Sequence, residues 1–77
     1  MPRIEGKLNI DNCIQALRLV KNLTQQDLAD AVNVTRATII ALEKGSYNPS
    51  LELAFRLAKF FKTSVEKIFY ESGDYRE

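Results

Sequence analysis

Residues that begin helices alternate with residues that end them through the middle of this chain. Thr24, Thr35 and Ser50 each precede a segment of helical apolar spacing, where a hydroxyl can accept a hydrogen bond from the first turn. Asn33 and Gly45 follow the first two segments, and both residue types tolerate the left-handed backbone conformation in which many helices end. The alternation predicts short helices joined by tight turns.

A further helix is expected before this region, over about residues 10–21. Ile10, Ile14, Leu17 and Val20 recur there at the spacing of one helical face. Three residues are candidates for its N-cap: Asn9, Asp11 and Asn12. Asn22 is expected to end it.

Four more helices are expected after it. The second covers residues 25–31 and the third residues 36–44; the fourth begins near Asn48–Ser50 and the fifth at Thr63 or Ser64. In each, the apolar side chains at helical spacing are predicted to face a common core. They are Leu28, Ala31 and Val32, then Ile39 and Leu42, then Leu53, Ala54, Leu57, Ala58 and Phe61, and finally Val65, Ile68 and Phe69.

Composition excludes several classes of function. The 77 residues include no His and a single Cys, Cys13, which removes His-based triads, most zinc sites and any internal disulfide. Neither a Gly-rich phosphate loop nor an acidic cluster at metal-ligand spacing occurs, so we expect no enzyme, no metal and no cofactor. No apolar run approaches the roughly 20 residues that span a bilayer, so we expect no membrane partner and a cytoplasmic location.

Net charge gives little guidance about partners. Eleven Lys and Arg residues against ten Asp and Glu residues leave +1, which by itself is not typical of nucleic-acid binding. Any argument for such binding must therefore rest on the pattern of particular residues.

That pattern lies between Leu23 and Gly45. Two capped helices are separated by three or four residues, and Ala29 is small enough to let them cross steeply at close range. Asn33 reverses the chain and the apolar Val34 follows it. These are the physical requirements of a helix-turn-helix, in which the second helix projects into the major groove of DNA.

At this point the sequence resembles the phage-repressor and Xre-like family of helix-turn-helix transcription regulators. The matching residues, in order, are Leu23-Thr24-Gln25, Asp27-Leu28-Ala29, Val34-Thr35-Arg36, Thr38-Ile39, Leu42-Glu43-Lys44-Gly45, Asn48-Pro49-Ser50-Leu51-Glu52-Leu53-Ala54 and Ile68-Phe69. The resemblance covers about residues 9–71. It implies an all-α, compact five-helix domain over residues 9–71, with the motif at about 24–44, an N-terminal arm at 1–8 and a polar tail at 72–77. A short two-stranded sheet from Lys7–Ile10 and Phe69–Glu71 is compatible with it.

The resemblance also implies roles for individual residues. Arg36 would read a base, since arginine binds guanine O6 and N7 with two hydrogen bonds, and Gln25 would bind a phosphate and brace Arg36. Arg18 and Glu43 match a family ion pair that ties the first helix to the recognition helix, residues 35–44. The remaining candidates for DNA contact are Gln26, Thr35, Ala37, Thr38, Ile40, Ala41, Lys44, Ser46, Tyr47 and Asn48.

Two features leave an alternative open. Ala37, Ile40 and Ala41 stand where many members of the family carry polar side chains, so base reading would depend on Arg36, on contacts with thymine methyl groups and on DNA shape. The same apolar face suits an antitoxin-like or adaptor module that binds a protein. We favour a sequence-specific repressor that acts on double-stranded DNA at the nucleoid, without a small-molecule ligand.

A homodimer is expected as well. Leu8, Ile10, Phe69 and Tyr70 would form a self-complementary surface, since so small a chain cannot easily bury all its large apolar groups. Two recognition helices would then lie about 34 Å apart and read a palindromic operator.

Overall fold

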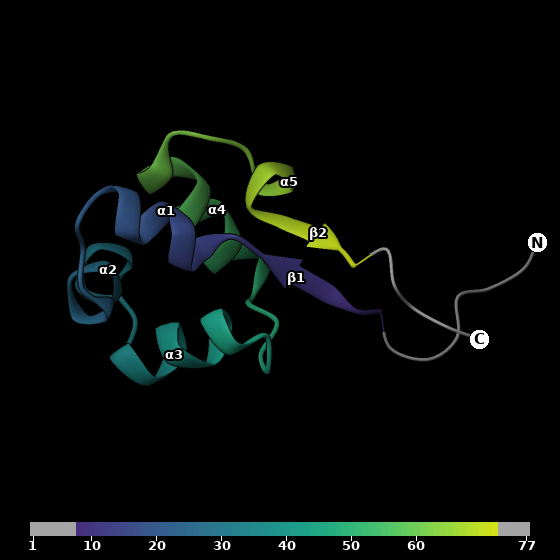
Figure 1. Ribbon diagram of the computed structural model, residues 1–77, viewed down its shortest axis with the longest axis horizontal. Helices are drawn as coiled ribbons and strands as arrows, with labels where there is room; N and C mark the ends of the chain where they lie inside the picture. Colours follow the sequence, from purple (N-terminus) through teal and green to yellow (C-terminus); the bar gives the residue numbers. More distant parts are fainter. Residues whose placement is uncertain (1–7, 73–77) are drawn as a thin grey trace, which may run out of the picture.

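The computed structural model describes residues 8–72 as five helices and a two-stranded sheet (Figure 1). In chain order the elements are β1 (Ile10–Asn12), α1 (Ile14–Val20), α2 (Gln25–Val32), α3 (Arg36–Lys44), α4 (Leu51–Phe61), α5 (Val65–Ile68) and β2 (Phe69–Glu71). The predicted fold class is confirmed. Apart from Leu8 and Ser72, the expected arm at 1–8 and tail at 72–77 lie outside the described residues.

The sheet joins the two terminal parts of the domain. β1 and β2 are antiparallel, with Ile10 opposite Glu71 and Asn12 opposite Phe69. The backbone N–H of Ser72 extends the pairing by donating to the carbonyl of Asn9 at 2.7 Å. The prediction that residues 10–21 form one helix is wrong at its start, because residues 10–12 pair with β2 and α1 begins only at Ile14. Of the predicted strand Lys7–Ile10, only Ile10 belongs to β1, and Lys7 lies outside the described residues.

The local rules for helix ends hold where the sequence shows them most clearly. Thr24 and Asp27 form a reciprocal capping box, with both hydrogen bonds at 2.9 Å. Thr35 accepts from the N–H of Thr38, and Ser50 accepts from that of Leu53. The left-handed residues that follow α1, α2 and α3 are those predicted: Asn22 (φ 57°), Asn33 (φ 63°) and Gly45 (φ 76°).

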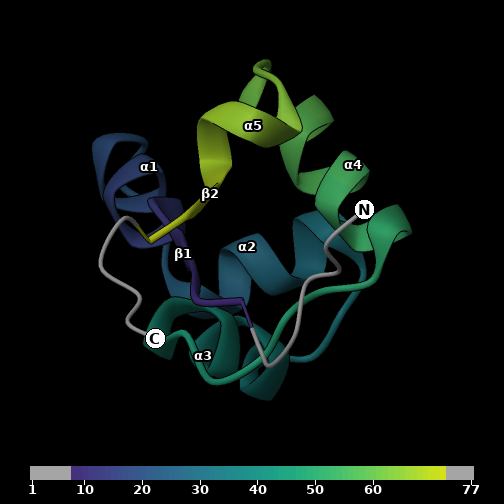
Figure 2. The same ribbon diagram turned by 90° about the vertical axis from the view of Figure 1, so that its right-hand side faces the viewer.

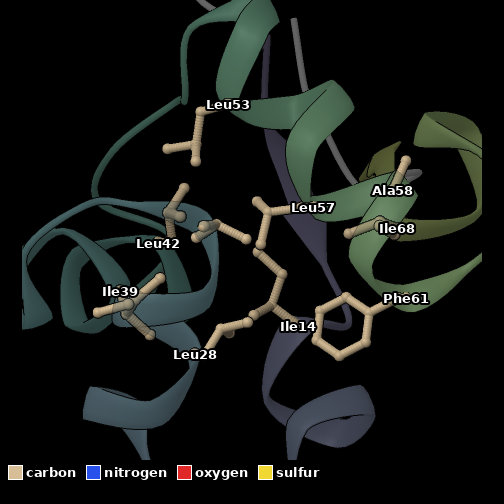
Figure 3. Close-up of a cluster of buried hydrophobic side chains, with 11 residues drawn as sticks. Ile14, Leu28, Ile39, Leu42, Leu53, Leu57, Ala58, Phe61 and Ile68 are labelled. Carbon is tan, nitrogen blue, oxygen red and sulfur yellow. The ribbon is translucent and has the colours of Figure 1, made fainter.

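The helices pack around one apolar core (Figure 3). Its fully buried large side chains are Ile14, Leu28, Ile39, Leu42, Leu57 and Ile68. Three residues of the predicted apolar helix faces are exposed instead: Ile10, at 36%, Val20, at 82%, and Ala31. Val20 lies about 120° around α1 from Ile14, and Arg18 takes the buried place on that helix. On α2, Ala29 is buried in place of Ala31.

Candidate nucleic-acid interface

The recognition helix α3 lies along one side of the molecule, away from α5 (Figures 1 and 2). Its inner residues, Ile39 and Leu42, are fully buried. On the outer side, Arg36, Ala37 and Lys44 are exposed, whereas Thr38, Ile40 and Ala41 are half-buried. The helix therefore combines an anchored apolar face with an outer face open to a partner.

The turn before α3 has the geometry that the sequence predicted. Asn33 takes the left-handed conformation, and the backbone N–H of Val34 donates to the carbonyl of Ala29 at 2.9 Å. Ala29 of α2 is fully buried, so a larger side chain there would disturb the packing of this close-packed region. Val34 packs against the edge of the core.

A buried ion pair fixes α3 to α1. Arg18 Nε donates to Glu43 Oε2 at 2.7 Å and Arg18 Nη2 donates to Glu43 Oε1 at 3.2 Å, with side-chain exposures of only 9% and 6%. Arg18 Nη1 also donates to the carbonyl of Leu23 at 2.8 Å. The hydrogen bond with Glu43 raises the pKa of Arg18 above its ordinary value. The predicted pair is confirmed.

Gln25 belongs to the same network. Its Nε2 donates to Glu43 Oε1 at 3.1 Å, so three elements meet at one carboxylate. No hydrogen bond joins Gln25 to Arg36 within residues 8–72, so the bracing of Arg36 stays a prediction. Gln25 and Arg36 nevertheless line one shallow hollow of about 560 Å³, together with Arg18, Thr24 and Gln26.

That hollow opens beside the amino-terminal ends of α2 and α3. Backbone N–H groups at helix N-termini attract anions, and Arg36 adds a full positive charge there. Gln26 is exposed, but its Nε2 donates to Asp30 at 2.9 Å. Asp27 is engaged by the capping box, and its hydrogen bonds with Thr24 lower the pKa of this carboxyl group.

The predicted loop contacts lie at the other end of α3. Lys44, Ser46, Tyr47 and Asn48 are exposed and line a second hollow of about 410 Å³. Ser46 differs from its neighbours because its hydroxyl donates to the carbonyl of Ala41 at 3.3 Å. A phosphate needs a hydrogen-bond donor, so this hydroxyl must leave Ala41 to serve it.

Other kinds of site find no support within residues 8–72. No group of three or more His, Cys, Asp or Glu residues gathers there in a way that suits a metal ion. Within the same range, each helix is too short or too polar to cross a membrane.

A profile of the helix-turn-helix family matches residues 14–68. The chain belongs to the helix-turn-helix family of transcription regulators. It is 52% identical over 63 residues to an HTH-type transcriptional regulator of Methanocaldococcus jannaschii, covering 82% of this chain and 96% of that one. It is also 34% identical over 59 residues to the cryptic phage CTXphi transcriptional repressor RstR of Vibrio cholerae, covering 77% of this chain and 53% of RstR.

A solved structure shares the architecture of this helix-turn-helix protein. The restriction-modification controller protein C.AhdI of Aeromonas hydrophila superposes with a TM-score of 0.65 at 28% sequence identity. The match covers 70% of this chain and 82% of C.AhdI.

Proposed function

We propose that the protein binds double-stranded DNA in a sequence-specific way and represses transcription by occluding a promoter. The observation that carries the proposal is α3, which is anchored on its inner face by Ile39 and Leu42 and open on its outer face from Arg36 onward. At nine residues it is about 14 Å long. An α-helix with its side chains is about 10–12 Å in diameter, and the major groove of B-DNA, about 12 Å wide, admits it.

The proposed DNA contacts are of two kinds, contacts with bases and contacts with phosphates. Arg36 is exposed at the first position of α3, where it can reach guanine, and Ala37 beside it can meet a thymine methyl group. Ile40 and Ala41 are half-buried and offer less to the groove. Gln25 retains one N–H of its amide after bonding Glu43, which suffices for one phosphate oxygen. The other proposed phosphate contacts come from Gln26, Thr35, Thr38, Lys44, Ser46, Tyr47 and Asn48.

The same exposures weigh against the alternative of a protein-binding module. Ile40 and Ala41 are partly covered by the fold, so the apolar surface on the outer side of α3 is small. Interfaces between proteins usually depend on large buried apolar anchors.

A homodimer completes the proposal. Leu8, Ile10 and Tyr70 are 40%, 36% and 47% exposed, whereas Phe69 is half-buried and packs on the core. Leu51 and Phe55 of α4, which the sequence reasoning did not include, are 72% and 55% exposed. An apolar groove of about 300 Å³ joins the two groups and is lined by Ile10, Asn48, Pro49, Leu51, Ala54, Val65 and Phe69. Such a surface, repeated in a second copy, would give the two-fold arrangement that reads a palindrome.

The test of DNA recognition is selection of binding sites from random double-stranded DNA, followed by titration at several salt concentrations. We expect a palindrome with half-site centres about 10 base pairs apart, and an affinity that falls steeply with salt through counterion release. Placed over a promoter, the selected site should lower reporter transcription. Salt-insensitive binding without an enriched sequence would contradict DNA recognition, and increased transcription would contradict repression.

The test of the dimer is sedimentation of two matched variants. Leu19 at the end of α1 and Phe55 on α4 are each 55% exposed, but only Phe55 lies on the proposed surface. Phe55→Glu should give a monomer at micromolar concentration, while Leu19→Glu should keep the mass of the wild-type dimer. A wild-type monomer at all concentrations tested, or dimers in both variants, would refute this surface.

A further inference from the structure

The side chain of Asn12 connects β1 to two helices at once. Its Nδ2 donates to the carbonyl of Leu42 at 2.9 Å, in the last turn of α3 and 30 residues along the chain. Its Oδ1 accepts from the backbone N–H of Ile14 at 3.1 Å, at the start of α1. The carboxamide thus uses a donor toward the recognition helix and an acceptor toward α1.

Little else joins β1 to α3. Within residues 8–72, the bond from Asn12 to Leu42 is the one hydrogen bond between these two elements. Beside it lies the polar hollow of about 410 Å³ that separates residues 8–11 from Lys44 and the loop after it. Packed side chains therefore do not fill this space, and the amide of Asn12 adds a direct link between β1 and α3 to the anchoring of α3 by the core.

The neighbouring residue completes the attachment of this turn. Leu42 accepts from Asn12, and Glu43, next in sequence, is held by Arg18 and Gln25. The carbonyl of Leu42 also accepts from the N–H of Gly45 at 3.0 Å, within the end of α3 itself. The last turn of α3 is thereby attached to β1, α1 and α2.

We infer that Asn12 is a positioning residue that sets the spacing between the two half-sites which the dimer reads. This inference rests on the proposed DNA-binding dimer. Ile10 of the proposed dimer surface and Asn12 lie in the same short strand, about 7 Å apart along it. The most direct path from this dimer surface to the recognition helix is therefore a single strand and one hydrogen bond, and further paths run from α4 and Phe69 through the shared core.

The dependence of DNA affinity on half-site spacing shows how firmly α3 is held relative to the dimer surface. Inserting one base pair moves a half-site by about 3.4 Å along the DNA axis and turns it by about 35°. A firmly positioned α3 cannot follow that change, so the wild type should lose at least about tenfold in affinity per base pair inserted or removed, comparable to one mismatched base pair. Loss of the hydrogen bond between Asn12 and Leu42 should let α3 adjust to a displaced half-site, so that affinity depends less on the half-site spacing.

The experiment compares three variants on a series of palindromes that differ only in spacing, and on a single half-site. Asn12→Asp keeps the acceptor for Ile14 but loses the donor for Leu42, and Asn12→Ser keeps a shorter, neutral acceptor. Asn9→Asp is the control, because it adds the same charge to an exposed neighbour whose side chain makes no hydrogen bond within the described residues. Circular dichroism melting establishes that each variant is folded.

We expect both Asn12 variants to bind the half-site as the control does, but to reduce the spacing penalty from about tenfold to within about threefold. If Asn12→Asp does not fold, Asn12→Ser carries the comparison. Spacing profiles equal to that of Asn9→Asp would overturn the role of Asn12 while leaving the proposed function intact. A uniform loss on every DNA, the half-site included, would also overturn it, since that result indicates a merely structural role. A wild type that binds no DNA would refute the proposed function itself.

Discussion

The two ends of α3 are held in different ways. At its carboxyl-terminal end, Leu42 and Glu43 receive hydrogen bonds from β1, α1 and α2, and the ion pair there is almost completely buried. At its amino-terminal end, Thr35 caps the helix from within its own segment, and Arg36 is exposed. The hydrogen bonds from other elements therefore hold the helix at the end remote from Arg36, so that the proposed reader is carried by a rigid support and remains free to contact DNA.

The largest effect is expected from breaking the buried pair. Glu43→Leu should lower the free energy of unfolding by about 3–5 kcal/mol, because it leaves the Arg18 guanidinium buried without its carboxylate. Urea denaturation measures this change. As a control, the double variant Arg18→Met with Glu43→Leu should be more stable than Glu43→Leu alone, since no unpaired charge remains. A single variant as stable as the wild type would show that the fixed end of α3 does not depend on this pair.

A smaller effect, confined to DNA affinity, is expected at the open end. Arg36→Ala should weaken binding to the selected site by about 1–3 kcal/mol and relax the preference at one base pair, with no change in unfolding. Lys67→Ala is the matched control, because it removes one positive charge from α5, on the opposite side of the molecule (Figure 2). Fluorescence anisotropy measures the affinity of both variants for specific and for random DNA. Equal weakening of both DNAs by Arg36→Ala would mean that Arg36 contacts phosphate.

The smallest effect concerns the cap of α2, on the same open side. The pKa of Asp27 is lowered in the folded protein by its hydrogen bonds with Thr24. The ionised carboxylate therefore stabilises the fold, and this contribution is fully present at a pH above 3.8, the ordinary pKa of the group. This stabilisation is lost as the pH falls through the lowered pKa. Asp27→Asn should therefore melt at a lower temperature than the wild type at neutral pH, and the difference should shrink in acid.

Asp30→Asn provides the control for that measurement, since it removes a carboxylate from the same helix without touching the cap. Melting curves recorded across the acid range decide the matter. A difference between Asp27→Asn and the wild type that stays constant with pH would contradict the capping contribution.

Predictions from the sequence succeeded mainly where an interaction spans only a few residues. The start of α1 is an exception, because its N-cap is Cys13 and none of the three predicted candidates. Ser64 precedes α5 as one of its two predicted caps, but its side chain makes no cap hydrogen bond. Thr24, Thr35 and Ser50 cap their helices, and Asn33 and Gly45 end theirs, because each bond forms within about one turn of the chain. The burial of Ile39 and Leu42 follows from helical spacing in the same way. The pair of Arg18 and Glu43 was found only through the family resemblance, since 25 residues separate them.

The predictions that differ from the structure concern residues whose place depends on distant parts of the chain. Residues 10–12 satisfy a helical apolar pattern, but they form a strand because residues 69–71 lie beside them. Val20 continues a helical spacing that starts at Ile10, but α1 starts only at Ile14, and Val20 lies about 120° around the helix from Ile14 and is 82% exposed. The family resemblance assigned Gln25 to Arg36, whereas in this structure Glu43 holds its amide.

The amino-acid sequence was sufficient to place the beginnings and ends of α2 and α3 and the beginning of α4, the apolar faces of α3 and α4, and the family resemblance. These follow from hydrogen bonds and periodicities within single segments. Three features became visible only in the folded molecule: β1 replaces the first turn of the expected helix, Glu43 binds both Arg18 and Gln25, and Asn12 attaches β1 to α3. These contacts join segments that are distant in the chain, and their approach depends on how the whole core packs.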